Sequence, residues 1–146
     1  MMRRILLLTV LFFIASAQAE KVCSAHDGDT IKLCTGESIR FNGIDAPELK
    51  QPYGVPARDY LRRLVVGKDV RLACKGKSYN RKVCGVYLGD LDVQRDMVDH
   101  GFAYDYFHYS RGRFADAEAF ARGRKLGVWA MPDGGERPWD YRRSKR

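Results

Sequence analysis

The spacing of apolar positions predicts short strands in the first part of the chain. Residues 21–26 and 30–34 are β-prone runs, and the Asp-Gly pair between them is typical of a hairpin turn with positive φ at both central residues. A third run, 38–44, places Ile39 and Phe41 on one face. Together these runs predict an antiparallel meander with polar side chains at its turns.

Further along, the apolar period changes to that of a helix. Residues 57–66 carry apolar side chains at the i, i+3, i+4, i+7 and i+8 positions, with Pro56 in the first turn and Gly67 at the stop. Two more strands and two more helices are expected at residues 69–74, 81–88, 93–100 and 114–126. Between these elements we expect a basic loop at 75–80 and an irregular aromatic segment at 102–109.

This order of elements predicts an α+β protein that is mainly a β barrel. Five short strands, one helix between the third and fourth strands and two helices after the fifth match a five-stranded OB-fold barrel with three helices. With no internal repeat, residues 20–146 are expected to form one domain. The tail from about residue 131 is rich in Pro, Gly and charge and is expected to be partly irregular with a frayed end, although Trp139 and Tyr141 could pack back.

Residues 1–19 have the pattern of an export signal. Two arginines precede an apolar run at 5–14, and the small residues of 17–19 form a cleavage signal. The run is shorter than the ~20 apolar residues that cross a bilayer. We therefore expect a signal peptide, a mature chain from Glu20, secreted or periplasmic localisation and no stable membrane association. The alternative is an uncleaved anchor.

Charge and cysteine content narrow the choice of partners and compartment. The net charge of +8, or +6 without the two leader arginines, suits a polyanion such as nucleic acid, anionic lipid or acidic polysaccharide, although it also favours solubility. All four cysteines follow the leader, so an oxidising compartment favours two disulfides. Because Cys23 and Cys34 flank one predicted hairpin and Cys74 and Cys84 another, we expect local pairing. A zinc site is disfavoured, because there is no C-x-x-C spacing and the three histidines are scattered.

Candidate chemistry concentrates where the third strand runs into a proline-stiffened bend. Asp29 and Asp45 are expected to converge through barrel curvature and, with the backbone carbonyl of Ala46, to hold a hard cation such as Ca²⁺. Glu48 follows Pro47, and a carboxylate beside a metal can take a proton from water. The alternatives are ordinary turn residues for the aspartates and a surface carboxylate for Glu48.

Basic and aromatic residues complete the candidate site. Arg40 and Arg81 belong to predicted strands, and their guanidinium groups can bind phosphate oxygens; the alternative is a salt bridge to nearby carboxylates. The other arginines, including those near the C-terminus, are expected to provide a diffuse positive field. Tyr79, Phe107 and Tyr109 lie among basic residues, where aromatic faces stack on bases; core packing is the alternative.

Taken in order, these motifs resemble the staphylococcal nuclease (thermonuclease) family. The motifs that carry the resemblance are Asp27-Gly28-Asp29-Thr30, Arg40 followed by Asp45-Ala46-Pro47-Glu48, Tyr79-Asn80-Arg81 and Gly127-Val128-Trp129. The likeness runs from about residue 22 to residue 129. It departs from the family at Ala46, where many members carry threonine, at Asn80 in place of a usual glycine, and at Phe107, where a pocket tyrosine is often found.

The resemblance implies an OB barrel and calcium-dependent hydrolysis of DNA and RNA phosphodiesters with 3′-phosphate products. By its motifs it implies calcium at Asp29, Asp45 and the Ala46 carbonyl, a general base at Glu48, phosphate-binding arginines at Arg40 and Arg81, and nucleotide-binding tyrosines at Tyr79 and Tyr109. We therefore expect a secreted, monomeric endonuclease. Two other classes stay open: a non-catalytic nucleic-acid-binding OB-fold module, which predicts gaps in this residue set, and a lipid or polysaccharide binder that uses only net charge.

Overall fold

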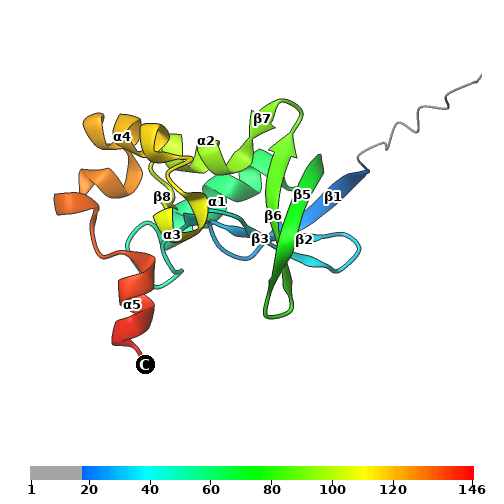
Figure 1. Ribbon diagram of the computed structural model, residues 1–146, viewed down its shortest axis with the longest axis horizontal. Coiled ribbons are helices and arrows are strands. Elements are labelled where there is room, and N and C mark those ends of the chain that lie inside the picture. Colours follow the sequence, from blue (N-terminus) through cyan, green and yellow to red (C-terminus); the bar gives the residue numbers. More distant parts are fainter. Residues whose placement is uncertain (1–17) are drawn as a thin grey trace, which may run out of the picture.

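The computed structural model describes residues 18–146 (Figure 1). The strands are β1 (Ala19–Ala25), β2 (Thr30–Leu33), β3 (Ser38–Phe41), β4 (Ile44–Asp45), β5 (Asp69–Ser78), β6 (Arg81–Leu88), β7 (Leu91–Asp92) and β8 (Tyr104–Asp105). The α-helices are α1 (Gly54–Val65), α2 (Val93–Asp99), α3 (Phe107–Ser110), α4 (Ala115–Gly123) and α5 (Pro138–Ser144), and two 3₁₀ helices are η1 (Gly127–Ala130) and η2 (Pro132–Gly134).

The main sheet has the strand order β3-β2-β1-β5-β6-β7. Neighbouring strands in this order are antiparallel, and β3 also pairs with β6 in parallel. That extra pairing brings the two ends of the five-strand run β3-β2-β1-β5-β6 together, as an OB barrel requires. The predicted α+β fold of OB type is therefore confirmed. The short strand β7 extends the sheet, and β4 pairs separately with β8.

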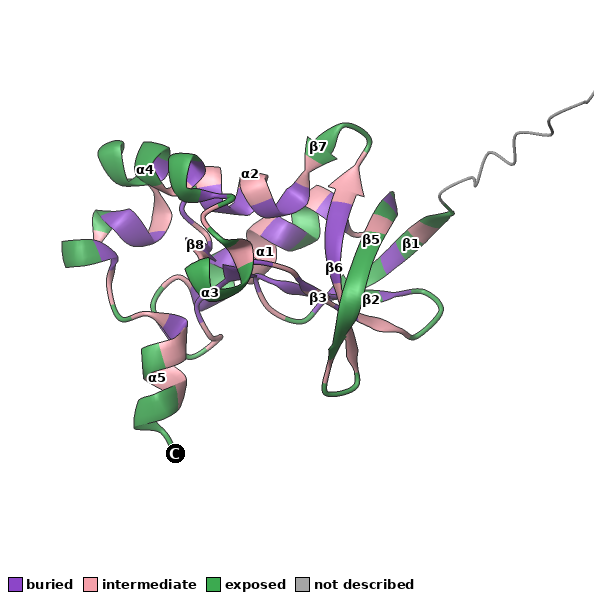
Figure 2. Cartoon of the chain, in the orientation of Figure 1, coloured by how far each residue is buried: buried purple, intermediate pink, exposed green. Residues whose placement is uncertain are grey.

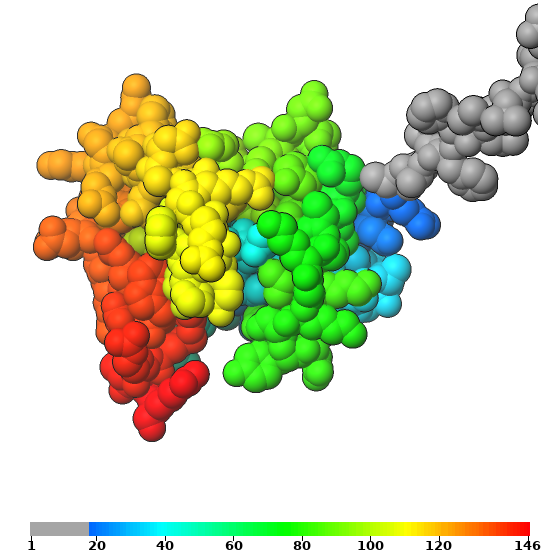
Figure 3. Space-filling view, in the orientation of Figure 1, coloured from blue at the N-terminus to red at the C-terminus, as the bar shows by residue number. Residues whose placement is uncertain are grey.

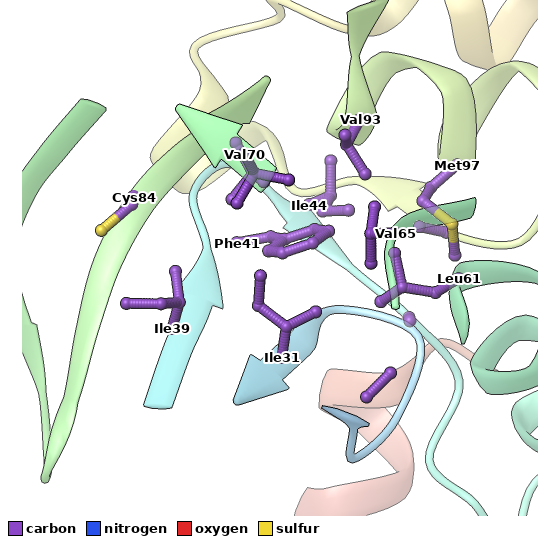
Figure 4. Packing of buried hydrophobic residues seen from close by; sticks show 14 of the residues in the cluster. Ile31, Ile39, Phe41, Ile44, Leu61, Val65, Val70, Cys84, Val93 and Met97 are labelled. Carbon is purple, nitrogen blue, oxygen red and sulfur yellow. The ribbon is translucent and has the colours of Figure 1, made fainter. Parts of the chain in front are cut away.

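The core lies between the sheet and the helices (Figure 4). Phe41 at the end of β3 and Ile44 in β4 are almost fully buried, and Leu61 and Val65 of α1 belong to the same cluster. Burying side chains of this size contributes roughly 1.5–3 kcal/mol each. Because Phe41 and Ile44 are both buried, the backbone between them is fixed, and so are the polar residues next to it. Figure 2 shows the burial along β6, in contrast to the exposed lower part of β5.

The hairpin between β1 and β2 forms as predicted, but Gly28 in its turn does not have the predicted role. Gly28 is not among the glycines with positive φ, so the predicted turn conformation is wrong. A Cβ at Gly28 would lie 2.7 Å from the Cβ of Ala46 and 2.9 Å from that of Ala57. The glycine thus lets the β1–β2 loop pack directly against the β4 segment and α1.

The second hairpin is longer than the sequence indicated. Strand β5 continues to Ser78, and pairing with β6 persists across a bulge between Cys74 and Gly76 until Ser78 faces Arg81. The predicted loop at 75–80 is therefore wrong except for its last two residues. The backbone ladder explains this, because each strand satisfies the other's hydrogen bonds even where the side chains are exposed. The predicted pairing of cysteines is present, with disulfides Cys23–Cys34 and Cys74–Cys84.

Three of the helices match the prediction, and two do not appear in it. Helices α1, α2 and α4 lie within a few residues of the expected ranges, whereas α3 forms inside the aromatic segment that we expected to be irregular. The tail, where we expected that Trp139 and Tyr141 could pack back, also contains a helix, α5. Pro138 begins it and is buried, and the ring of Trp139 stacks on that of Tyr106 with 4.9 Å between centroids.

The predicted signal peptide lies almost wholly outside the described residues and stays a prediction. Within residues 18–146, no helix combines the length and apolar character needed to cross a membrane.

Candidate active site

Two aspartates from distant positions converge beside one arginine. Asp29 lies directly before β2, and its Oδ2 accepts a hydrogen bond of 2.7 Å from the backbone N–H of Ala46. Asp45 belongs to β4 and is 1 % exposed. The Nη2 atom of Arg40 lies 3.2 Å from Asp29 Oδ2 and 3.0 Å from Asp45 Oδ1. Both carboxylates therefore reach the same nitrogen, so the expected convergence of Asp29 and Asp45 is present.

Arg40 is fixed by the chain that curls around it. Its Nη1 donates to the carbonyls of Phe41 at 2.9 Å and Ile44 at 3.0 Å, while Nη2 reaches the carboxylates. Gly43, with φ near 80°, makes the turn between these two carbonyls. A Cβ at Gly43 would lie 3.2 Å from Phe114 and from Ser110, so the turn is also tightly packed. The guanidinium group is thereby held as part of the site's frame.

Two carboxyl groups of this cluster, those of Asp27 and Asp45, have pKa values raised by burial. Asp27 accepts a hydrogen bond of 3.1 Å from the N–H of Asp29, and burial together with the charge of Asp29 raises the pKa of Asp27 to about 7. Burial raises the pKa of Asp45 to about 6, although hydrogen bonds from Arg142 oppose the shift. Clustered anions in a low-dielectric place are costly without a positive partner, so the site favours cations.

Glu48 is held by its backbone. Its N–H donates to Gln51 Oε1 at 2.9 Å, and Gln51 Nε2 donates to the carbonyl of Glu136 at 3.0 Å. A Cβ at Gly54 would lie 1.9 Å from the carbonyl oxygen of Glu48, so only glycine lets α1 begin this close. The Glu48 side chain is 35 % exposed and keeps access to solvent. Gln51 was not predicted from the sequence, because an amide in a Pro/Gly-rich loop has no periodicity to mark it.

Arg81 reaches the same cluster from the neighbouring strand. Its Nη1 lies 3.4 Å from Thr30 Oγ1, which donates to Asp29 Oδ1 at 3.1 Å. The parallel pairing of β3 with β6 places Arg81 on this side of the barrel. Arg81 and Thr30 also line a groove of about 710 Å³. The other cationic or titratable residues lining it are His26, Lys32, Arg58 and Arg62.

One arginine of the site was not predicted. Arg142 of α5 donates from Nη2 to Asp45 Oδ2 at 2.6 Å, and from Nη1 to Asp45 Oδ1 at 3.2 Å and Glu48 Oε1 at 2.7 Å. The hydrogen bond with Asp45 raises the pKa of Arg142 above its ordinary value. The expectation that C-terminal arginines provide only a diffuse field is therefore wrong here. Trp139 was the available signal, because an aromatic residue in a polar tail suggests packing against the body.

The predicted stacking residues are all exposed. Tyr79 is 89 % exposed at the tip of the β5–β6 hairpin, and Phe107 and Tyr109 lie exposed on α3. Core packing, the alternative for Phe107, is therefore wrong. In Figure 3 the β5–β6 hairpin and the C-terminal segment form two projections with a hollow between them. The roles of Tyr79 and Tyr109 toward a substrate stay predictions.

The donor set suits a hard cation better than a soft one. In the part of the chain that the structure describes, no group of three or more His, Cys, Asp or Glu side chains is arranged to hold a metal. The cysteines form disulfides, which removes thiolates as ligands. Two converging buried carboxylates remain, and Ca²⁺ is commonly held by few carboxylates completed with backbone carbonyls and water. Asp29 and Asp45 therefore fit such an ion.

An OB-type barrel that gathers buried aspartates and arginines beside a basic groove defines a class of protein suited to phosphate-containing polyanions. Residues 38–131 match the family model described as staphylococcal nuclease homologue. The chain belongs to the staphylococcal nuclease family. The matched segment ends before α5, so Arg142 lies beyond it.

Several curated proteins are similar over most of this chain. A rice protein named probable staphylococcal-like nuclease CAN2 is 38 % identical over 128 residues, which cover 86 % of this chain and 34 % of the relative. An uncharacterized endonuclease of Haemophilus influenzae is 35 % identical over 141 residues, covering 88 % and 79 %. Protein ParB of Escherichia coli is 33 % identical over 165 residues, covering 98 % and 91 %. The chain spans about a third of the length of the rice relative.

Proposed function

We propose that this protein is a calcium-dependent nuclease that hydrolyses phosphodiester bonds of DNA and RNA and leaves 3′-phosphate ends. The observation that carries the proposal is the convergence of Asp29 and Asp45 on Arg40, with Glu48 and Arg81 beside them. Family membership and relatives named nuclease or endonuclease support it.

In this proposal Asp29, Asp45 and the backbone carbonyl of Ala46 would hold the cation. When bound, Ca²⁺ polarises a phosphate oxygen and makes a nearby water more acidic. The two carboxylates come from different elements that the Ala46–Asp29 hydrogen bond joins, so their separation is set by the fold rather than by one flexible loop. This is the kind of preorganisation that metal-assisted hydrolysis needs.

Glu48 accepts the proton of the attacking water or orients that water. The Gln51 hydrogen bond and the close approach of Gly54 hold its backbone, while its carboxylate is 35 % exposed and pairs with Arg142, which must move before Glu48 can reach a water. A base must lie within hydrogen-bond reach of the proton that it takes, so this fixed backbone is part of the chemistry.

The two predicted arginines, Arg40 and Arg81, have different roles in this proposal. Arg40 already donates to two carbonyls and two carboxylates, so it mainly organises the site. Among the residues that the structure describes, Arg81 has one side-chain hydrogen bond, the long contact with Thr30. Arg81 also lines the groove, so its guanidinium group is available to phosphate oxygens. Donors aimed at the charge that develops on phosphorus typically contribute about 10²–10³-fold in rate.

The groove suits a sugar-phosphate backbone. Arg58 and Arg62 of α1 and Lys32 of β2 line it, and none of the described residues that line it carries a carboxylate. Contacts to phosphates carry no base information, which fits cleavage of both DNA and RNA. Stacking of bases on Tyr79 and Tyr109 would add about 1–3 kcal/mol per base. We further propose that the protein is a secreted or periplasmic monomer, which the two disulfides support.

Plasmid nicking with millimolar Ca²⁺, with and without EGTA, tests the proposal. We expect wild-type protein to cut supercoiled DNA and labelled RNA only with Ca²⁺, and Glu48→Gln to lose most of this activity. Labelling of the product 3′ ends that requires prior phosphatase treatment would identify 3′-phosphates. Plasmid that stays intact yet shifts in a gel would instead support the non-catalytic binding module.

A further inference from the structure

We propose that Arg142 is a positioning residue of the active site, which competes with the divalent cation for Asp45 and withholds Glu48 until the cation binds. The inference rests on the proposed function and concerns a residue outside the segment that matches the family model. It assigns a role in metal loading to the C-terminal helix α5.

The contacts of Arg142 carry the proposal. One guanidinium group donates to both oxygens of Asp45 and to Glu48 Oε1, at 2.6–3.2 Å. The Nη1 atom is shared between Asp45 and Glu48, so the two carboxylates are linked through a single nitrogen. A cation that takes Asp45 as a ligand needs the same oxygens and repels the same positive charge. Binding of the cation and occupation by Arg142 therefore oppose each other.

The tail is anchored so that Arg142 faces the site. Trp139 stacks on Tyr106 with an interplanar angle of 7°, and the carbonyl of Glu136 accepts a hydrogen bond from Gln51. Gln51 also binds the backbone of Glu48, so the same amide ties the tail to the segment that carries the base. The contact between α5 and the barrel is thus specific and joins residues 97 positions apart.

Arg142 can leave without unfolding the tail. Its side chain is 40 % exposed, whereas that of Asp45 is 1 % exposed. A long arginine side chain at the edge of the site can rotate into solvent while Trp139 keeps α5 in place. Because Arg142 Nη1 also binds Glu48, rotation of this side chain frees both the proposed metal ligand Asp45 and the proposed base Glu48. The site would then expose its base only when the cation is present.

Calcium affinity measured by titration calorimetry tests this competition independently of activity. We expect Arg142→Gln to bind Ca²⁺ on the order of tenfold more tightly than wild type, because the competing charge is gone. Arg143→Gln is the matched control, since it removes the same charge from the next position of α5. The Arg143 side chain is 78 % exposed, and within residues 18–146 its one ion pair is with Asp140. We expect its affinity to stay within about twofold of wild type.

A second variant tests the anchoring. Trp139→Ala keeps Arg142 but removes the stack on Tyr106, and it should also tighten Ca²⁺ binding. Equal affinity of wild type, Arg142→Gln and Arg143→Gln would overturn the competition while leaving the metal centre standing. Weaker binding by Arg142→Gln would overturn it as well and make Arg142 a support for the ligands. If neither wild type nor Arg142→Gln binds millimolar Ca²⁺, the proposed function and this inference both fail.

Discussion

Replacing Gly54 by alanine tests whether the backbone position of Glu48 matters for catalysis. In an ordinary helix this change stabilises by roughly 0.5–1 kcal/mol, because glycine loses more conformational entropy on folding. Here the new Cβ would lie 1.9 Å from the carbonyl oxygen of Glu48 and 2.9 Å from the Cα of Leu49. Since both neighbours are backbone atoms, no side chain can turn away to relieve the clash.

The magnitude follows from the distance that must be recovered. An ordinary contact needs more than 3 Å, so α1 and the Glu48 segment must separate by over 1 Å in total. Overpacking of this kind typically costs about 1–3 kcal/mol in the free energy of unfolding. A displacement of about 1 Å in a catalytic group can cost on the order of 10²-fold in rate. We therefore expect Gly54→Ala to be less stable and to lose roughly 10²-fold in kcat.

The assay compares kcat on a labelled oligonucleotide at saturating Ca²⁺ with thermal unfolding of the same samples. Gly123→Ala is the control, because it also adds a methyl group to a helix but meets no atom within 4 Å. We expect the control to keep its kcat and to be equally or more stable. A folded Gly54→Ala protein with wild-type kcat would refute the reasoning, since it would show that catalysis tolerates movement of Glu48.

Three further results are expected. The raised pKa values of Asp27 and Asp45, about 7 and 6, mean that the folded state binds more protons than the unfolded state above pH 4. Metal-free protein should therefore lose stability as pH rises from 4 to 7, by on the order of 5 kcal/mol for the two groups together in chemical denaturation. A flat profile would contradict this. Lys32→Glu with Arg62→Glu should raise KM and make KM less dependent on salt, with little change in kcat, because fewer phosphate contacts release fewer counterions on binding. Arg124→Glu reverses a charge outside the groove and should change neither value. Reducing the two disulfides should cost about 2–4 kcal/mol each in the free energy of unfolding; an unchanged melting temperature would show that the barrel stands without them.

Local patterns in the sequence were enough for much of the fold. Helical periodicity predicted α1 within three residues, because this helix buries one face against the core. The strand β6 was predicted at its observed bounds. Both disulfides were also predicted, because each pair of cysteines flanks a predicted hairpin. The sequence also indicated that Arg40 and Asp45 belong to the site. Both lie next to the buried residues Phe41 and Ile44, which fix the position of the backbone between them.

Two features of the site depend on the tertiary structure alone: the close packing around its glycines and the contact made by Arg142. Gly28 and Gly54 are needed because other segments of the chain pack directly against their Cα atoms. The residues next to each glycine in the sequence do not show which atoms these are. Arg142 reaches Asp45 across 97 residues because the stacking of Trp139 folds the tail back. Side-chain periodicity reports which face of an element is buried, whereas a contact between two polar side chains depends on how whole elements pack, and that is settled only when the chain has folded.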